Sequence, residues 1–200
     1  MKEKIVADIS ELPDHGLGTA SLTWWGTLAF ILIEGTGFAL AIATYFYLQS
    51  VAPAWPIAAP RPDLLAGTLT TGTLVASVLP NIYLSRWAER QDLRLVRAGL
   101  LVMSVLGVLP LIIRVFEFPA LHVKWDANAY GSAVWLLLGL HTTHLITDLA
   151  DTFVLTALMF TRHADNARRY GDVTDNAMYW NFVVIAWLPI YACIYWVPRL

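Results

Sequence analysis

The stretch from Trp24 to Leu48 reads WWGTLAFILIEGTGFALAIATYFYL, and Glu34 is its only charged side chain. An α-helix needs about 20 apolar residues to cross the hydrocarbon core of a bilayer, because it rises about 1.5 Å per residue. Backbone N–H and C=O groups in lipid must be hydrogen-bonded within the segment, which favours a helix over a lone strand. The stretch therefore predicts a transmembrane helix.

Four further segments share this length and apolar character. Hydrophobic residues make up 58% of the 200 positions and charged residues only 14%, whereas soluble domains usually carry about a quarter charged residues. We expect an all-α fold, a polytopic membrane helical bundle with five transmembrane helices in one domain (24–200), behind a cytoplasmic tail (1–23) without a removable signal peptide. The expected spans are 24–48, 64–85, 98–118, 131–160 and 177–197.

The cationic residues are divided unevenly between the two sides of the predicted bundle. Nine of the 13 Lys and Arg residues lie on the side of the N-terminal tail. Connections rich in Lys and Arg stay on the cytoplasmic side, so we expect the N-terminus inside and the C-terminus outside. The majority comprises Lys2, Lys4, Arg86, Arg90, Arg94, Arg97, Arg162, Arg168 and Arg169, and the minority Arg61, Arg114, Lys124 and Arg199. This balance gives no reason to expect a nucleic-acid partner.

Glu34 lies about ten residues into the first span, or roughly 15 Å deep at 1.5 Å per residue. Ionisable groups at such depth are costly and deserve a functional hypothesis. Glu34 could handle protons or bind a lipid headgroup or another polar partner. The structural alternative is a carboxyl that is hydrogen-bonded across helices and serves packing, with Gly35 and Gly37 allowing close approach.

The fourth span places four titratable residues on one face of the expected helix. His141, His144, Asp148 and Asp151 are spaced by three and four residues, which brings side chains to one side of a helix. Imidazole and carboxylate suit zinc or iron, and the same groups could relay protons or form a hydrogen-bonded seam. The proton relay and the seam both stay open, whereas we predict no metal site and no catalytic or cofactor-binding residue.

Other polar residues support this view of a chain without its own redox centre. Haem axial ligation usually takes histidines from two helices, and only the fourth span contains any. Cys193 is the only cysteine, so no intrachain disulfide can form. Arg114 and Glu117, three residues apart, predict a local ion pair near the outer boundary.

Five pieces of the sequence, in order, resemble subunit III of the haem–copper oxidases. Five spans instead of seven resemble the short bacterial form. The pieces are Leu28–Phe38 around Glu34; Tyr45-Phe46-Tyr47 with the prolines that follow; Phe116-Glu117-Phe118; Gly139–His144; and Tyr179–Trp187 with Tyr195-Trp196. Asn181 and Val184 stand where the family has His and Asp, and Asp148 and Asp151 look like additions.

The resemblance implies a non-redox subunit of a terminal oxidase in the respiratory chain, in the bacterial inner membrane. It implies docking on catalytic subunit I beside further subunits, bound phospholipid, a supporting role in proton uptake and stability, and haem and copper in the partner subunits. The departures leave room for an accessory subunit of a quinol oxidase or nitric oxide reductase. From the residues alone, a free-standing transporter or membrane enzyme using Glu34, His141, His144 and Asp148 stays open.

Overall fold

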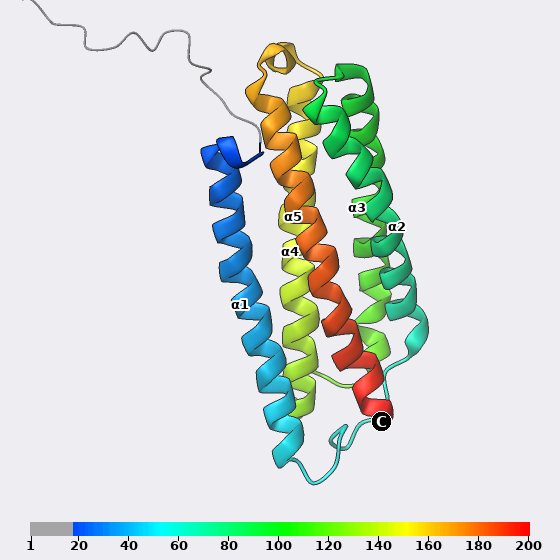
Figure 1. Ribbon diagram of the computed structural model, residues 1–200. Helices are drawn as coiled ribbons and strands as arrows, with labels where there is room; N and C mark the ends of the chain where they lie inside the picture. The colour runs from blue at the N-terminus through cyan, green and yellow to red at the C-terminus, as the bar shows by residue number, and fades with distance from the viewer. Residues whose placement is uncertain (1–17) are drawn as a thin grey trace, which may run out of the picture.

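The structure is a computed structural model that describes residues 18–200, and within them it contains five long α-helices and no strand (Figure 1). All five are long and apolar enough to cross a membrane. The predicted all-α membrane bundle is thereby confirmed, while most of the expected tail lies outside the described residues. The helices are α1 (Leu22–Val51), α2 (Leu64–Glu89), α3 (Leu93–Glu117), α4 (Ala129–Met159) and α5 (Arg168–Tyr191).

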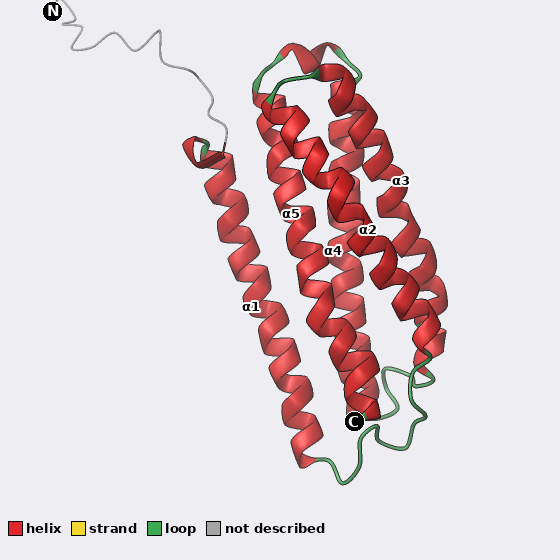
Figure 2. Ribbon diagram, turned by 45° about the vertical axis from the view of Figure 1, so that its right-hand side comes forward, coloured by secondary structure: helices red, strands yellow, loops and turns green. Residues whose placement is uncertain are grey.

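Helices α2 to α5 form a closed group, and α1 lies along its side (Figures 1 and 2). In this group α2 packs on α3 and α5, and α4 packs on the same two helices, whereas α1 packs mainly on α4 and α5. Burial follows this arrangement: 6% of the most apolar window of α1 is buried, against 50% in α4 and in α5. Helix α1 is therefore the least enclosed of the five.

Small residues let the helices of this group approach closely. A Cβ atom at Gly107 of α3 would lie 2.8 Å from Cδ1 of Leu149 in α4. A Cβ at Gly99 would lie 3.0 Å from Cδ1 of Leu84 in α2. Glycine at such crossings gains dispersion contacts between the helices, which is the main attraction available inside a membrane.

The connections follow from their sequences. Residues 52–63, which carry four prolines, are not helical, as the missing N–H groups and fixed φ angles of proline predict. The short turn before α3 ends at Asp92, whose carboxylate accepts hydrogen bonds from the backbone N–H groups of Arg94 and Leu95. This N-cap satisfies backbone donors that the first turn of a helix leaves free.

The fifth helix is longer than the apolar run that predicted it. Its α-helical part begins at Arg168, and beyond Tyr191 it continues as a π-helix over Ala192–Trp196. Residues 168–176, which we expected in a loop, are thus helical, because a helix can extend past the apolar segment wherever its polar side chains find partners. The extension carries Asp172, Asp175 and Asn176 onto the face that meets α1 and α4.

Candidate functional site

A cluster of buried polar residues forms around Glu117 at the end of α3, and we call it the Glu117 cluster. The carboxylate is fully buried. Its Oε2 accepts hydrogen bonds from Arg114 Nη1 at 2.8 Å and Thr70 Oγ1 at 2.9 Å, and its Oε1 accepts one from Tyr195 Oη at 2.7 Å. The predicted Arg114–Glu117 ion pair is confirmed, and it belongs to a network that joins α2, α3 and the chain beyond α5.

His141 extends the Glu117 cluster into α4. Its Nε2 lies 3.0 Å from the carbonyl oxygen of Val183, and its Nδ1 lies 3.0 Å from Arg114 Nη2. A carbonyl can only accept, so Nε2 carries the proton and Nδ1 accepts from the guanidinium, which assigns a neutral imidazole. The ring of Trp187 lies 4.3 Å from the guanidinium carbon and adds a cation–π contact.

Gly67 makes room for the tyrosine that completes this cluster. A Cβ atom at Gly67 would collide with the ring of Tyr195. Without a side chain at position 67, the tyrosine ring passes α2 and brings its hydroxyl to Glu117. The cluster therefore depends on a glycine that carries no polar group itself.

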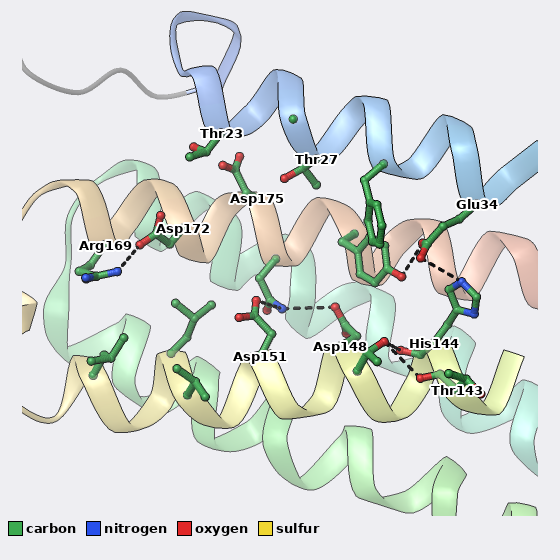
Figure 3. A pocket seen from close by; sticks show the side chains of 18 residues that line it. Thr23, Thr27, Glu34, Thr143, His144, Asp148, Asp151, Arg169, Asp172 and Asp175 are labelled. Atoms are coloured by element: carbon green, nitrogen blue, oxygen red, sulfur yellow. Dashed lines mark hydrogen bonds and ion pairs between the residues drawn. The ribbon is translucent and has the colours of Figure 1, made fainter. Parts of the chain in front are cut away.

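A second, open set of polar residues lines a cavity of about 700 Å³ between α1, α4 and α5 (Figure 3). We call it the acidic cavity because five carboxyl groups line it. Thr23, Thr27 and Phe30 of α1 contribute to its wall, together with Val154 and Leu155 of α4. The carboxyl groups are those of Glu34, Asp148, Asp151, Asp172 and Asp175.

Glu34 closes the inner end of the acidic cavity by linking α1 to α4 and α5. Its Oε2 accepts a hydrogen bond of 2.6 Å from Tyr179 Oη, and its Oε1 lies 3.2 Å from Nε2 of His144. The Nδ1 of His144 lies 2.7 Å from the carbonyl oxygen of Leu140, so that nitrogen is the donor there. The second ring nitrogen of His144 thus faces the carboxyl group of Glu34.

Asn176 of α5 organises the middle of the cavity. Its Nδ2 donates to Asp148 Oδ1 at 3.3 Å and to Asp151 Oδ2 at 3.2 Å. Its Oδ1 accepts from Thr152 Oγ1 at 3.2 Å. One amide thus holds two carboxyl groups of α4 in place, and nearer the mouth Arg169 pairs with Asp172 at 2.8 Å.

The four titratable residues of the expected α4 face do not act together. His141 turns into the Glu117 cluster, whereas His144, Asp148 and Asp151 face the acidic cavity (Figure 3). Among the described residues no group of three or more His, Cys, Asp or Glu side chains is arranged to hold a metal ion. Asn181 accepts a 3.0 Å hydrogen bond from Asn81 Nδ2 and joins α2 to α5.

Sequence reasoning missed the part of the cavity that belongs to α5. Asp172, Asn176 and Tyr179 were not proposed, although they recur every three or four residues and so share one helical face. That periodicity was the available signal. It was overlooked because charged residues before an apolar span suggest a loop outside the membrane.

The fold and these two polar clusters define a polytopic membrane protein whose deeply placed polar groups mainly bind one another. Both ring nitrogens of His141 and of His144 are engaged by protein atoms, so these residues do not fit the axial ligation of a haem. The model of the family described as cytochrome c oxidase subunit III matches residues 5–198. The chain belongs to the cytochrome c oxidase subunit III family.

Individual relatives agree with this family. The chain is 23% identical over 188 residues to cytochrome c oxidase subunit 3 of Thermostichus vulcanus, covering 93% of this chain and 92% of the relative. It is 27% identical to the subunit 3 of Drosophila melanogaster over 196 residues, covering 91% of this chain and 73% of the relative. It is 29% identical to the subunit 3 of Loxodonta africana over 185 residues, covering 86% of this chain and 68% of the relative.

Proposed function

We propose that the chain is the non-redox subunit III of a haem–copper terminal oxidase, docked on catalytic subunit I in a bacterial inner membrane. The observation that carries the proposal is the family match over residues 5–198. The chain supplies apolar surface and buried polar contacts, while haem and copper belong to its partner subunits. Its task is to hold and protect the catalytic subunit during turnover.

The polar groups inside the membrane mainly bind one another. This favours an accessory role in the complex over independent catalysis. The Glu117 cluster binds Arg114 and His141 inside the bundle, so neither side chain is free to meet a substrate. Oε1 of Glu34 lies 3.2 Å from Nε2 of His144 at the inner end of the acidic cavity. A carboxyl–imidazole pair of this kind can hold a proton near a partner's uptake path, which fits a contribution to proton uptake.

The exposed side of α1 suits bound phospholipid. Leu32, Ile33 and Leu40 are each more than 60% exposed, and α1 packs mainly against α4 and α5. Apolar side chains exposed at membrane depth gain from contact with acyl chains. We expect phospholipid along this flank, detectable by mass spectrometry of lipids that stay with the protein after detergent washing.

The expected orientation follows from the cationic residues around the end of the bundle where α1 begins. Arg86 and Arg90 end α2, and Arg168 and Arg169 begin α5 at this end (Figure 1). The positive-inside rule then puts this end in the cytoplasm. Reporter fusions after Leu200 and inside residues 161–167 should report opposite sides, and finding both on one side contradicts the orientation.

Co-purification tests the proposal. A tagged chain, extracted in mild detergent at native expression level, should retain partner subunits and the reduced-minus-oxidised absorbance of haem. The matched control is an equally tagged, unrelated five-helix protein from the same membranes. Recovery of the chain alone, monodisperse and without haem, contradicts the proposal and supports a free-standing transporter or enzyme.

A further inference from the structure

We propose that the acidic cavity binds a linear polyamine, an organic cation with two or more ammonium groups joined by short methylene chains. The proposal goes beyond the oxidase role and does not depend on which partner the chain binds, because every residue concerned belongs to this chain. It rests on buried carboxyl oxygens without a hydrogen-bond partner, on the charge of the cavity, and on the spacing of the polar residues that line it.

Both carboxyl oxygens of Asp175 and one of Asp148 have no hydrogen-bond partner, and both residues line the cavity. Asp148 lies in the middle of the cavity wall. The residue is 2% exposed, and while its Oδ1 accepts from Asn176, its Oδ2 has no hydrogen-bond partner. A buried acceptor without a donor is costly, and such atoms commonly meet a ligand or an ion. Asp148 is one of the residues that line the cavity (Figure 3), so its carboxyl group borders the space that a ligand would fill.

The charge of the cavity selects a cation. Five carboxyl groups line it, and its basic side chains are His144 and Arg169, of which Arg169 already pairs with Asp172. Acidic side chains therefore outnumber basic ones in the lining. Like charges repel most strongly where water is scarce. A phosphate group would be repelled here, which separates this site from the phospholipid expected on the outer flank of α1.

Three polar residues of α5, each beside one or more carboxyl groups, are spaced to match several ammonium groups in line. Asp172, Asn176 and Tyr179 follow one another at about one helical turn, roughly 5 Å along the axis, and each marks a level of the cavity. Asp172 stands at the first level, Asn176 holds Asp148 and Asp151 at the second, and Tyr179 holds Glu34 at the third. Ammonium groups separated by three or four methylenes lie at a similar distance from each other.

The rest of the lining suits the methylene chains and the approach from outside. Phe30 and Tyr179 stack with ring centroids 5.8 Å apart, and Val154 and Leu155 add aliphatic surface. Aromatic faces attract ammonium groups, and apolar walls cover the carbons between them. Asp151 is exposed, so the cavity is accessible from outside the bundle.

Direct binding measurement tests the proposal. The full chain in its purified complex, in nanodiscs of phosphatidylcholine at low salt, should bind spermidine saturably at one site per chain. The double variant Asp151→Asn with Asp175→Asn should weaken binding by about tenfold or more, because charge pairs across an interface govern affinity and on-rate. The matched control, Asp63→Asn with Asp126→Asn, removes two exposed carboxyls at the opposite end and should bind as the unmodified protein does. Propylammonium, with one charge, should bind more weakly than spermidine.

The thermal unfolding midpoint is a second measurement, which distinguishes weaker binding from misfolding of the variant. Spermidine should raise the thermal midpoint of the unmodified protein and of the control variant, since a ligand that binds only the folded state stabilises it, and should raise that of the cavity variant less. The proposal is overturned by non-saturable binding, by equal weakening in both variants, or by equal displacement with Mg²⁺ at matched ionic strength. Loss of spermidine binding when phosphatidylethanolamine is added would assign the cavity to a lipid headgroup and overturn it as well.

Discussion

The Glu117 cluster and the acidic cavity differ in how far their ionisable groups are paired within the chain. In the cluster one carboxylate receives three hydrogen bonds, one of them from an arginine that also meets an imidazole and an indole ring. In the cavity five carboxyl groups share two basic side chains, and three buried carboxyl oxygens, one of Asp148 and two of Asp175, have no hydrogen-bond partner. The first region is neutralised within the chain, whereas the second is left acidic.

The difference follows the packing of the helices around each region. The cluster lies within the closed group of α2 to α5, where no water or ligand can compensate a charge, so the chain must compensate it. The cavity lies between α1, α4 and α5, and α1 stands at the side of the closed group (Figure 2). There, outside molecules can supply the missing partner. Enclosed polar groups in this protein serve structure, and incompletely enclosed ones are free to bind.

The largest expected effect comes from breaking the enclosed ion pair. Glu117→Gln removes the negative charge and leaves the guanidinium of Arg114, 2% exposed, without an anion. Removing one partner of a buried ion pair costs about 3–5 kcal/mol. Heating the purified complex in detergent should show a much lower unfolding midpoint and a low yield of assembled protein. An unchanged midpoint would mean that the cluster is not a structural unit.

Gly67→Ala should have the next largest effect, because the new methyl group collides with the ring of Tyr195. Overpacking of this kind costs about 1–3 kcal/mol, and the displaced tyrosine no longer reaches Glu117. The matched control is Gly139→Ala, where no heavy atom lies within 4 Å of the added Cβ. Equal midpoints for the two variants would contradict the role given to Gly67.

The effect of replacing Glu34, at the inner end of the acidic cavity, should depend on whether the new side chain can still accept a hydrogen bond. Glu34→Ala leaves the half-buried Tyr179 hydroxyl without its acceptor, a loss of about 1 kcal/mol. Glu34→Gln keeps an acceptor and should leave the complex assembled, with turnover reduced less than about tenfold, or about 1.4 kcal/mol in the barrier. Turnover of the Gln variant measured across pH is the test, and a larger loss would make Glu34 an obligatory proton carrier.

The smallest effect should come from Asp151→Asn in the open region. The residue is exposed, and the hydrogen bond that it accepts from Asn176 can be accepted by the amide oxygen of asparagine as well. Stability should change by no more than about 0.5 kcal/mol. Chemical or thermal unfolding curves of Asp151→Asn and Glu117→Gln measure the difference in stability between the two variants. A comparable loss of stability in both would contradict the distinction between the two regions.

The fold was predictable because each span carries its own signal. Twenty or more apolar residues specify a membrane helix without knowledge of its neighbours, and the prolines of residues 52–63 mark the first connection. The Arg114–Glu117 pair was likewise predictable, since both residues lie on one helix three positions apart.

The distribution of polar residues between the two regions was not predictable from one helix at a time. His141 and His144 lie within an arc of one helical face, yet one meets Arg114 and the other meets Glu34. Which neighbour lies on each edge of that arc depends on how α1, α3 and α5 pack around α4. The contribution of α5 was missed for a related reason, because its start depends on partners across the cavity and not on apolar residues.

Quantifying haem and copper on each separated polypeptide tests the central claim most directly. The purified complex is dissociated gently, this chain is isolated from the remaining subunits, and the metals and haem in both fractions are measured by mass spectrometry and absorbance. The account predicts that all haem and copper stay with the remaining subunits and that this chain carries neither. Stoichiometric haem, iron or copper on the isolated chain would contradict a non-redox subunit.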